Sequence, residues 1–517
     1  LSYAGCDLTT LKQRQRRIQQ LRVVLQLGRF LPLGGVEDVR EFLRKASKGN
    51  ILEPRELLSC AVVARASADC KEFLNRPDFE LTEFSLLEQK LVGLKPLASR
   101  IEGVFESGGE IRDNASERLF QLREQHRQTH LQARTRLNKL VEKLSQKGIL
   151  QEAYFSVRGD RYVLPVIASF SGQVPGFVHN SSQSGQTFFI EPMELVELGN
   201  RIAVLNSQIQ EEEQRILKEL SEDVADQESV FVGNLGVIGR LDALQAGAAL
   251  SEEFGWVEAQ VEEKQILKLQ GFKHPLMVFQ GEAVVENDLQ LSEQGLVISG
   301  PNAGGKTVLL TAVGLVVQLA RLGLPVPCRQ AAVPFFDKLV ALVGDAQDLQ
   351  KGWSTFSGQL HGLKNALKAV EQGSHCLVLL DELAAGTDPA EGAALGIAVL
   401  SYLLKRGSTV LVTTHLNALK LFSAGDARCQ GVSMGLDPQT LEPTFKLQTE
   451  FLGSSGALAL AKRLELPPEI IDQAESHLSA DKEHSLLKLL EEKQQGIERS
   501  KAQLQANLEE IEVKQDE

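Results

Sequence analysis

The sequence predicts a large α/β domain with a parallel sheet, joined to a mostly helical region that carries a long arm. After residue 271, short apolar runs alternate with glycine-rich loops and helical segments up to about residue 452, which is typical of parallel strands covered by helices. Between residues 11 and 100, apolar residues recur at helical spacing. Residues 111–148 contain no proline, and no glycine before the last position. As one helix they would be roughly 57 Å long and would project from a globular core.

The length of the chain and the order of its segments predict four parts. A chain of 517 residues is long enough for three or four domains. Two strand-like runs lie between the long helical segment and a second one at 194–226, which predicts two arm helices with a small β-rich tip. The expected parts are a helical core at 1–110, arm helices at 111–235 with a tip at about 154–192, the α/β domain at 236–455, and a helical dimerisation segment at 456–517. In the last part, apolar residues at every seventh position predict the start of a coiled coil, at Leu490, Ile497, Leu504 and Ile511.

Composition excludes several classes of protein. The formal net charge is −13, so contact with a nucleic acid would need a local basic patch. Six cysteines are scattered without a Cys-x-x-Cys pair, which disfavours a zinc ribbon or a disulfide framework and fits a reducing cytosol. The longest apolar stretch, 313–328, is interrupted by Gln318 and Arg321, so we expect no membrane span and a cytoplasmic protein. Because the chain begins with Leu1 and has no leader sequence, we interpret it as a piece of a longer protein.

A phosphate-binding loop is predicted at residues 300–307, which fit the pattern G-x-x-x-x-G-K-[ST]. A strand-like run precedes the loop and a helical segment follows it, as such a loop requires. Lys306 would place a cation on the outer phosphates, and the Thr307 hydroxyl would bind magnesium. The alternative is a glycine-rich turn without a ligand. The residues of the predicted loop are Gly300, Pro301, Asn302, Ala303, Gly304, Gly305, Lys306 and Thr307.

Two carboxylates follow the apolar run at 377–380, which is the pattern of a buried strand that ends at the carboxyl edge of a sheet. Asp381 is predicted to hold magnesium, and Glu382 to act as the general base or to orient the attacking water. Such a pair alone is more simply explained as a solvated strand end. Together with the loop at 300–307, it predicts ATP hydrolysis.

Three further residues lie where a nucleotide could be sensed. His415 ends another apolar run, although a single histidine at a strand end is usually structural. Asp388 follows the carboxylate pair and is also explained as part of an Asp-Pro turn. Ser354 stands before a helical segment, where helix capping is the simpler role.

These motifs resemble those of the MutS-type ATPases, in particular the second bacterial MutS paralogue, the branch without mismatch-reading N-terminal domains. The likeness rests on G-P-N-A-G-G-K-T, S-T-F-S, D-E-L-A-A-G-T-D-P-A-E-G and T-T-H in their order and spacing, and on S-G-Q-T-F-F-I-E-P at 184–192. It covers essentially the whole chain. The resemblance implies an α/β ABC-class P-loop ATPase domain that binds ATP and Mg²⁺ and closes as a head-to-head homodimer. It also implies a mostly α-helical core, long lever helices and a small β-rich clamp tip that meets a partner.

The resemblance also implies roles for individual residues. Ser354 would reach the γ-phosphate bound by the other subunit, and His415 and Asp388 would be switch residues of the closed dimer. Asn287, in a segment that leads into the phosphate loop, is placed with the nucleotide-binding residues, and His274 lies in the same region. Ala303, Ala384 and Leu416 depart from the residues expected at their positions, but none has a phosphate-binding role. Members of this branch carry a nuclease-like domain after a linker, and no nuclease activity is assigned to the residues of this chain.

The partner of the arms stays open between two polyanions. Between residues 111 and 147, nine basic residues stand against four acidic ones, and a second basic cluster runs from Lys12 to Arg29. A solvated helix face is the simpler explanation of each cluster. The resemblance allows branched or recombining DNA, or a stalled or collided ribosome and its rRNA, and charge does not separate them. We favour nucleic-acid or ribosome quality control, with ribosome splitting slightly ahead because the sequence shows no base-reading element.

Two other classes are weighed against this function. An ABC-type transporter ATPase subunit is disfavoured because the motif L-S-G-G-Q is absent and the arm has no use in such a subunit. A non-catalytic structural clamp is disfavoured because Lys306, Thr307, Asp381 and Glu382 are all present.

Overall fold

The computed structural model describes residues 7–158, 161–263, 266–301, 304–344, 355–371, 375–383, 387–437, 440, 442–448 and 467–479. The chain is mixed α/β and divides into two compact units. Leu1–Phe30 and Ala243–Glu517 form one, here called the sheet unit, and Leu31–Asp242 form the other, here called the arm unit. The predicted coiled coil lies outside the described residues, and the four-part domain division stays a prediction.

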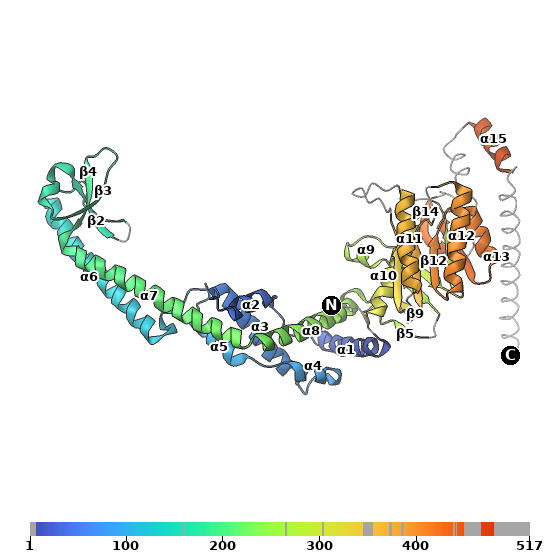
Figure 1. Ribbon diagram of the computed structural model, residues 1–517, viewed down its shortest axis with the longest axis horizontal. Helices are drawn as coiled ribbons and strands as arrows, with labels where there is room; N and C mark the ends of the chain where they lie inside the picture. The colour runs from blue at the N-terminus through green and yellow to red at the C-terminus, as the bar shows by residue number, and fades with distance from the viewer. Residues whose placement is uncertain are drawn as a thin grey trace, which may run out of the picture. The chain divides into compact units, whose positions relative to one another are not determined.

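The arm unit is mainly helical. Its helices are α2 (Arg40–Ser47), α3 (Pro54–Leu74), α4 (Ser85–Lys90), α5 (Lys95–Val104), α6 (Glu117–Gln146), α7 (Met193–Asp226) and the first part of α8 (Glu228–Phe254), with 3-10 turns at Thr82–Phe84, Asp113–Ala115 and Ala168–Gln173. A capping box formed by Glu53 and Glu56 starts α3, and Pro54 at its first position has no N–H group to leave unpaired. The two longest helices of this unit, α6 and α7, lie side by side (Figure 1).

The pairing of α6 with α7 follows from their apolar faces. The 30 residues of α6 span about 45 Å. Ser116 caps its first turn by accepting a hydrogen bond from the Leu119 amide at 3.0 Å, and donates to Glu212 of α7 at 2.7 Å. Further along, Leu137 of α6 and Ile202 of α7 belong to one buried cluster. The two helices are therefore antiparallel, which matches the arm expected from the sequence.

Four antiparallel strands form the tip of the arm. They are β1 (Ser156–Arg158), β2 (Arg161–Ile167), β3 (Gly176–Ser181) and β4 (Thr187–Pro192), in the order β1-β2-β4-β3. Leu164 of β2 pairs with Ile190 of β4, and both side chains join the cluster that holds α6 to α7. At Gly176 a Cβ would lie 2.1 Å from the Glu191 carbonyl oxygen, so only glycine permits this close approach of β3 to β4.

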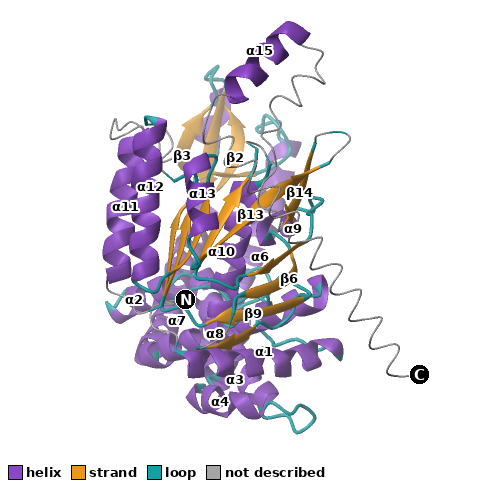
Figure 2. Ribbon diagram, turned by 90° about the vertical axis from the view of Figure 1, so that its right-hand side faces the viewer, coloured by secondary structure: helices purple, strands orange, loops and turns teal. Residues whose placement is uncertain are grey.

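The sheet unit is built on a six-stranded sheet (Figure 2). Its order is β10-β11-β12-β8-β13-β14, and all neighbouring pairs are parallel except β13 with β14. The strands are β8 (Gly295–Ser299), β10 (Lys338–Leu342), β11 (Cys376–Leu380), β12 (Thr409–Thr413), β13 (Cys429–Leu436) and β14 (Pro443–Gln448). In β11, Leu377 and Leu379 enter one core while Val378 and Leu380 enter the other. Burial on both faces explains why the parallel strands appear as continuous apolar runs in the sequence.

Helices and a second sheet complete this unit. The helices are α1 (Leu8–Gln26), α9 (Pro275–Phe279), α10 (Lys306–Arg321), α11 (Thr355–Glu371), α12 (Pro389–Lys405), α13 (Asn417–Gly425) and α15 (Pro468–Ser479). The second sheet has the order β5-β9-β6-β7, with β5 (Gln260–Glu262), β6 (Lys268–Phe272), β7 (Asn287–Gln290) and β9 (Gln330–Pro334). In α1, Leu11 belongs to the sheet core and buried Gln15 donates to the Ala259 carbonyl at 2.7 Å. Helix α1 thus packs with the sheets, a grouping that its sequence does not indicate.

No helix in the described ranges is both long enough and apolar enough to cross a membrane.

Candidate functional site

The predicted phosphate loop connects β8 to α10. Gly305, with φ at +84°, precedes the first residue of α10, and Gly300 has φ at +145°. Both are backbone conformations that glycine adopts without the steric cost that other residues pay. The first N–H groups of α10 have no partner within the helix, so its N-terminus favours an anion. Asn302 and Ala303 lie outside the described residues.

Lys306, the first residue of α10, is buried against this loop. Its side chain is 5% exposed, and its Nζ donates to the carbonyl oxygens of Gly300 at 2.8 Å and Pro301 at 2.9 Å. Burial lowers the pKa of Lys306, whereas the nearby carboxylates of Glu382 and Asp381 act in the opposite direction. Both hydrogen-bond partners are neutral carbonyls and do not neutralise the ammonium. Its positive charge is therefore available to an anionic ligand.

Asp381 joins the loop to the carboxyl edge of the six-stranded sheet. Its Oδ2 accepts a hydrogen bond from Thr307 Oγ1 at 2.8 Å, and its Oδ1 accepts one from Thr413 Oγ1 at 2.6 Å. The Thr413 hydroxyl also accepts from the backbone N–H of Glu382 at 2.9 Å. Thr413 ends β12, is fully buried, and was not among the residues predicted from the sequence. Its signal was the hydroxyl at the end of an apolar run, which does not by itself identify a partner.

Glu382 has an unusual backbone conformation for a residue with a side chain. Its φ is +46°, in the left-handed region that residues other than glycine rarely adopt. Such conformations cost free energy and cluster at functional sites, where the surrounding structure holds them in place. Here the Thr413 hydroxyl holds the Glu382 amide, and Glu382 lines the same cavity as Lys306 and Thr307.

That cavity has a volume of about 420 Å³ and a lining of mixed chemistry. Lys306, Thr307 and Glu382 contribute charged and polar groups, and the rest is mainly apolar, with Phe272, His274, Met277, Met434 and Phe445 among its residues. Burial lowers the pKa of His274, which favours the neutral imidazole. Volume and lining are those of a site for a small molecule that has a charged end and an apolar end.

Asn287, in β7, holds one wall of this cavity. Its Nδ2 donates to the Phe445 carbonyl at 3.0 Å and its Oδ1 accepts from the Leu447 amide at 2.7 Å, so both ends of the amide bind the backbone of β14. Phe445 has φ at +56°, and a Cβ at Gly305 would lie 3.0 Å from its ring. The structure therefore gives Asn287 a positioning role for Phe445. Its predicted role in nucleotide binding stays a prediction.

The remaining predicted residues are more dispersed. Asp388 Oδ1 accepts hydrogen bonds from the amides of Ala390 at 2.9 Å and Glu391 at 3.2 Å, so it caps α12. His415 follows β12 and is exposed. Neither residue belongs to the described residues that line the cavity. Ser354 lies outside the described part of the chain, and the dimer roles of these three residues stay predictions.

The donors of the cavity fit a complex of magnesium and a nucleotide. Mg²⁺ prefers oxygen ligands and binds through one or two protein groups beside phosphates. Thr307 and Asp381 bring a hydroxyl and a carboxylate to one point. Lys306 supplies the cation, and the start of α10 supplies N–H groups.

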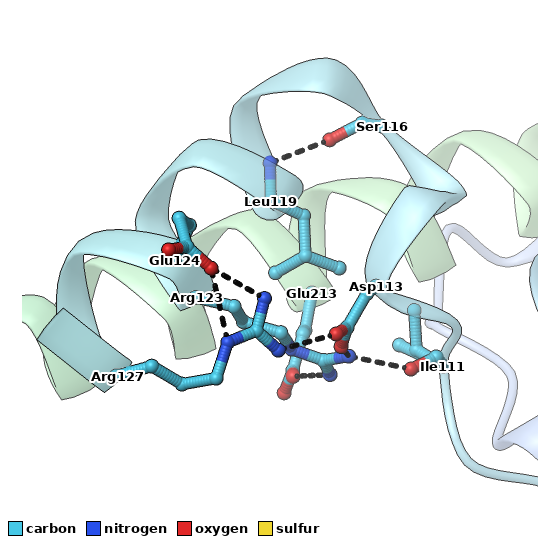
Figure 3. A network of polar contacts seen from close by, with 8 residues as sticks. All are labelled: Ile111, Asp113, Ser116, Leu119, Arg123, Glu124, Arg127 and Glu213. Carbon is cyan, nitrogen blue, oxygen red and sulfur yellow. Dashed lines mark hydrogen bonds and ion pairs between the residues drawn. The ribbon is translucent and has the colours of Figure 1, made fainter.

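The charged residues of the arm are arranged differently from the basic stripe that the sequence predicts for residues 111–147. At the start of α6, Arg123 forms ion pairs with Asp113 at 2.6 Å and Glu213 at 2.7 Å (Figure 3). Arg127 pairs with Asp113 at 2.7 Å and with Glu124 at 2.9 Å. Arg123 is also 22% exposed and donates to the Ile111 carbonyl at 2.8 Å. These two arginines hold the start of α6 together and are not free cations.

The end of α6 nearer the tip contrasts with its start. Five basic residues there are exposed and form no ion pair with another described residue: Arg134, Arg136, Lys139, Lys143 and Lys147. The sequence of this half of the helix contains a single acidic residue, Glu142. In the tip, the guanidinium of Arg158 lies 4.2 Å from the centre of the Phe189 ring. On α6, the basic residues without an acidic partner among the described residues therefore lie on the distal half of the helix.

Comparison with known proteins defines the class. The family model described as MutS domain V matches residues 296–481, which include the predicted phosphate loop, both carboxylates and His415. This part of the chain therefore resembles MutS domain V.

Three curated relatives, each called "Endonuclease MutS2", extend the match over most of the chain. The protein of an Anaeromyxobacter species is 40% identical over 475 residues, which cover 89% of this chain and 59% of the relative. That of a Geobacillus species is 36% identical, covering 90% and 60%, and that of Symbiobacterium thermophilum is 35% identical, covering 96% and 62%. The chain thus spans about three-fifths of the length of these relatives. The resemblance to the second MutS paralogue is confirmed.

Proposed function

We propose that this chain is an ATPase that binds ATP and magnesium in the cavity beside the six-stranded sheet. The observation that carries the proposal is the 2.8 Å hydrogen bond between Thr307 and Asp381, because it brings the loop helix and the end of β11 to one point. These two oxygen groups are the kind of ligand that Mg²⁺ takes beside phosphates in P-loop ATPases. The match to MutS domain V and the likeness to the relatives called "Endonuclease MutS2" support the proposal, because MutS proteins are ATPases.

The residues of the cavity would divide the work of hydrolysis. Magnesium, when bound by Thr307 and Asp381, neutralises charge on the phosphates. Lys306 exchanges its two carbonyl partners for phosphate oxygens, which form stronger, charge-assisted hydrogen bonds. Glu382 orients the attacking water or accepts its proton. Thr413 keeps Asp381 and the Glu382 backbone in place through the two hydrogen bonds that it makes.

The apolar wall would take the base of the nucleotide. Phe445 and Phe272 offer aromatic surface for it, and Asn287 fixes the strand that carries Phe445. Because Phe445 approaches Gly305, the base-binding wall and the phosphate loop are neighbours.

We further propose that ATP closes a homodimer and that the arms then grip a polyanion. Ser354, Asp388 and His415 would complete the site across the dimer. The exposed cations on the distal half of α6 suit a phosphate backbone, which attracts Lys and Arg whatever its sequence. The partner would be branched or recombining DNA, or a stalled or collided ribosome that the closed dimer splits. This places the chain in nucleic-acid or ribosome quality control.

The alternatives are weaker. A transporter ATPase subunit gives no use to the arm unit, which comprises Leu31–Asp242. A non-catalytic clamp gives no reason for the left-handed backbone of Glu382 or for the hydroxyl of Thr413 that holds it.

The partner is tested by trapping the ATP-bound form. Glu382→Gln, incubated with ATP and magnesium, is used to capture partners, and the bound material is assayed separately for ribosomal RNA and DNA. The matched control is Glu382→Gln combined with Lys306→Ala, which cannot hold the nucleotide. Equal capture of both nucleic acids by the control and the trap would refute ATP-dependent gripping. For the dimer, turnover per subunit should fall on dilution, and constant turnover by a verified monomer would refute a site shared between subunits.

A further inference from the structure

Two histidines of the arm unit face each other on one side of α6. His126 and His130 are one helical turn apart, and their Nε2 atoms are 3.0 Å apart. The ring centres are 4.4 Å apart and the ring planes are inclined by 71°. Two histidines at positions i and i+4 of a helix are a recurring pair of metal ligands, because they project from the same face.

The two rings are also held by different elements of the arm. His130 Nδ1 lies 2.7 Å from the Tyr162 hydroxyl of β2. His126 hydrogen-bonds the side chain of Asn206, which belongs to α7. Histidines that bind metals almost always use one nitrogen for the metal and donate the N–H of the other to such a partner, which fixes the ring. His130 therefore has this support at Nδ1, and its Nε2 faces the Nε2 of His126.

Burial favours the neutral form of His126. Burial, and then the neighbouring His130, lowers the pKa of His126, while the bond to Asn206 acts in the opposite direction. Neutral imidazole is the form that binds metals. The charged neighbours are Arg127 on the same helix, which is paired with Asp113 and Glu124, and Arg134, whose charge acts on Tyr162. Arg134 opposes a bound cation and limits the affinity.

We propose that His126 and His130 chelate one divalent transition-metal ion, such as Zn²⁺, through their Nε2 atoms. Imidazole suits Zn²⁺ and its neighbours in the transition series, whereas Mg²⁺ prefers oxygen. Among the described residues no third His, Cys, Asp or Glu completes a ligand cluster, so water fills the other positions of the ion. The ion would tie α6 to β2 and α7 through Tyr162 and Asn206, at the joint between the arm helices and the tip.

Metal binding requires a proton to move within the pair. In the metal-free pair one Nε2–H donates to the other Nε2. When the metal bonds to both Nε2 lone pairs, that proton transfers to the Nδ1 of the same ring. If the ring is His130, its Nδ1–H then donates to Tyr162, whose hydroxyl accepts instead of donating. If both rings are neutral before binding, no net proton is released; if the pair carries an extra proton, one is released for each metal bound.

The test is titration of the full chain with ZnCl₂ by calorimetry. The protein carries no affinity tag and no nucleotide, and excess Mg²⁺ occupies the oxygen site at Thr307 and Asp381. We expect one Zn²⁺ per chain, and an affinity that falls at least roughly tenfold in His126→Gln or His130→Gln, because each removes one of two ligands. Tyr162→Phe keeps both ligands and should weaken binding by roughly tenfold or more, because Nδ1 of His130 then has no hydroxyl partner. His361→Gln, in α11, is the control and should bind as the wild type does.

The outcomes separate a metal site from a plain hydrogen bond. Equal Zn²⁺ affinity in the wild type, His126→Gln and His130→Gln would overturn the proposal, as would no binding by the wild type. Circular dichroism checks that each variant is folded. If a histidine variant unfolds, Tyr162→Phe decides, and unchanged affinity in it together with unchanged Co²⁺ absorption would overturn the site. The experiment measures Zn²⁺ binding and not ATP turnover. A negative result would therefore not bear on the proposed ATPase activity.

Discussion

The cavity of the sheet unit and the start of α6 in the arm unit are built from the same kinds of charged residue with opposite results. Lys306 is 5% exposed and binds two neutral carbonyl oxygens, so its charge stays available to a ligand. Arg123 is 22% exposed and binds two carboxylates, so its charge is already neutralised. The comparison teaches that the number of basic residues in a segment does not predict a binding surface. What predicts it is whether each cation has neutral or acidic partners.

The largest expected effect follows from Lys306. Lys306→Ala removes the cation together with its hydrogen bonds to the loop carbonyls, and we expect it to abolish ATP binding in calorimetry. Lys405→Ala, an exposed lysine at the end of α12, is the matched control and should bind as the wild type does. Equal nucleotide affinity for the wild type and Lys306→Ala would remove the basis of the proposed phosphate loop.

The next effect separates binding from chemistry. Glu382→Gln keeps the size of the side chain but cannot accept a proton, so we expect ATP binding to persist and turnover to fall roughly a hundredfold to ten-thousandfold. Thr413→Val, which removes the hydroxyl that holds Asp381 and Glu382, should lower turnover and weaken the dependence on magnesium. Steady-state turnover and calorimetry measure the two effects. Wild-type turnover in Glu382→Gln would assign the water to another group.

The arm sharpens the comparison through two sets of variants. Arg123→Gln leaves Glu213 without its partner and Asp113 with Arg127 alone, and we expect a decrease of roughly 2 kcal/mol in the stability of the arm, with the salt dependence of partner binding unchanged. Reversal of Arg136, Lys139 and Lys143 to Glu should leave stability nearly unchanged. It should also make the slope of the logarithm of the binding constant against the logarithm of salt concentration shallower, by about 0.9 for each duplex phosphate that the arm no longer neutralises.

Urea unfolding measures the first effect, and binding to duplex DNA and to ribosomes at several salt concentrations measures the second. The two sets act as controls for each other, because each changes the same type of charge at a different end of α6. An unchanged salt slope after the distal reversal, for both partners, would move the binding surface to the basic cluster between Lys12 and Arg29.

The smallest effect depends on pH. Glu212 is 2% exposed on α7, and hydrogen bonds, chiefly from Arg215, lower its pKa from 4.5 to about 2. A carboxylate whose folded pKa is lowered stabilises the fold above its unfolded pKa, and this contribution disappears as pH falls from about 4.5 toward 2. We expect the stability difference between the wild type and Glu212→Gln to shrink over that range in urea unfolding. A constant difference from pH 6 to below pH 3 would contradict the lowered pKa.

The local structure of the chain could be predicted from its sequence. The strand before the phosphate loop, the helix after it, the strand before Asp381 and the paired strands of the tip are all present where periodicity and composition predicted them. Buried parallel strands need continuous apolar runs, and loops with positive φ need glycine, so a short window of sequence carries this information.

The contacts between distant segments were decided by the tertiary structure alone. Only strand order brings Thr413 beside Asp381, and only the position of β7 brings Asn287 to the backbone of β14. The pairing of α6 with α7 likewise brings Glu213 to Arg123 and removes that arginine from the predicted basic stripe. The sequence by itself determined which elements form and which residue types they carry, because propensity and periodicity act over a few residues. Which side chains meet depends on topology and packing, and these determine whether a charge is free or already paired.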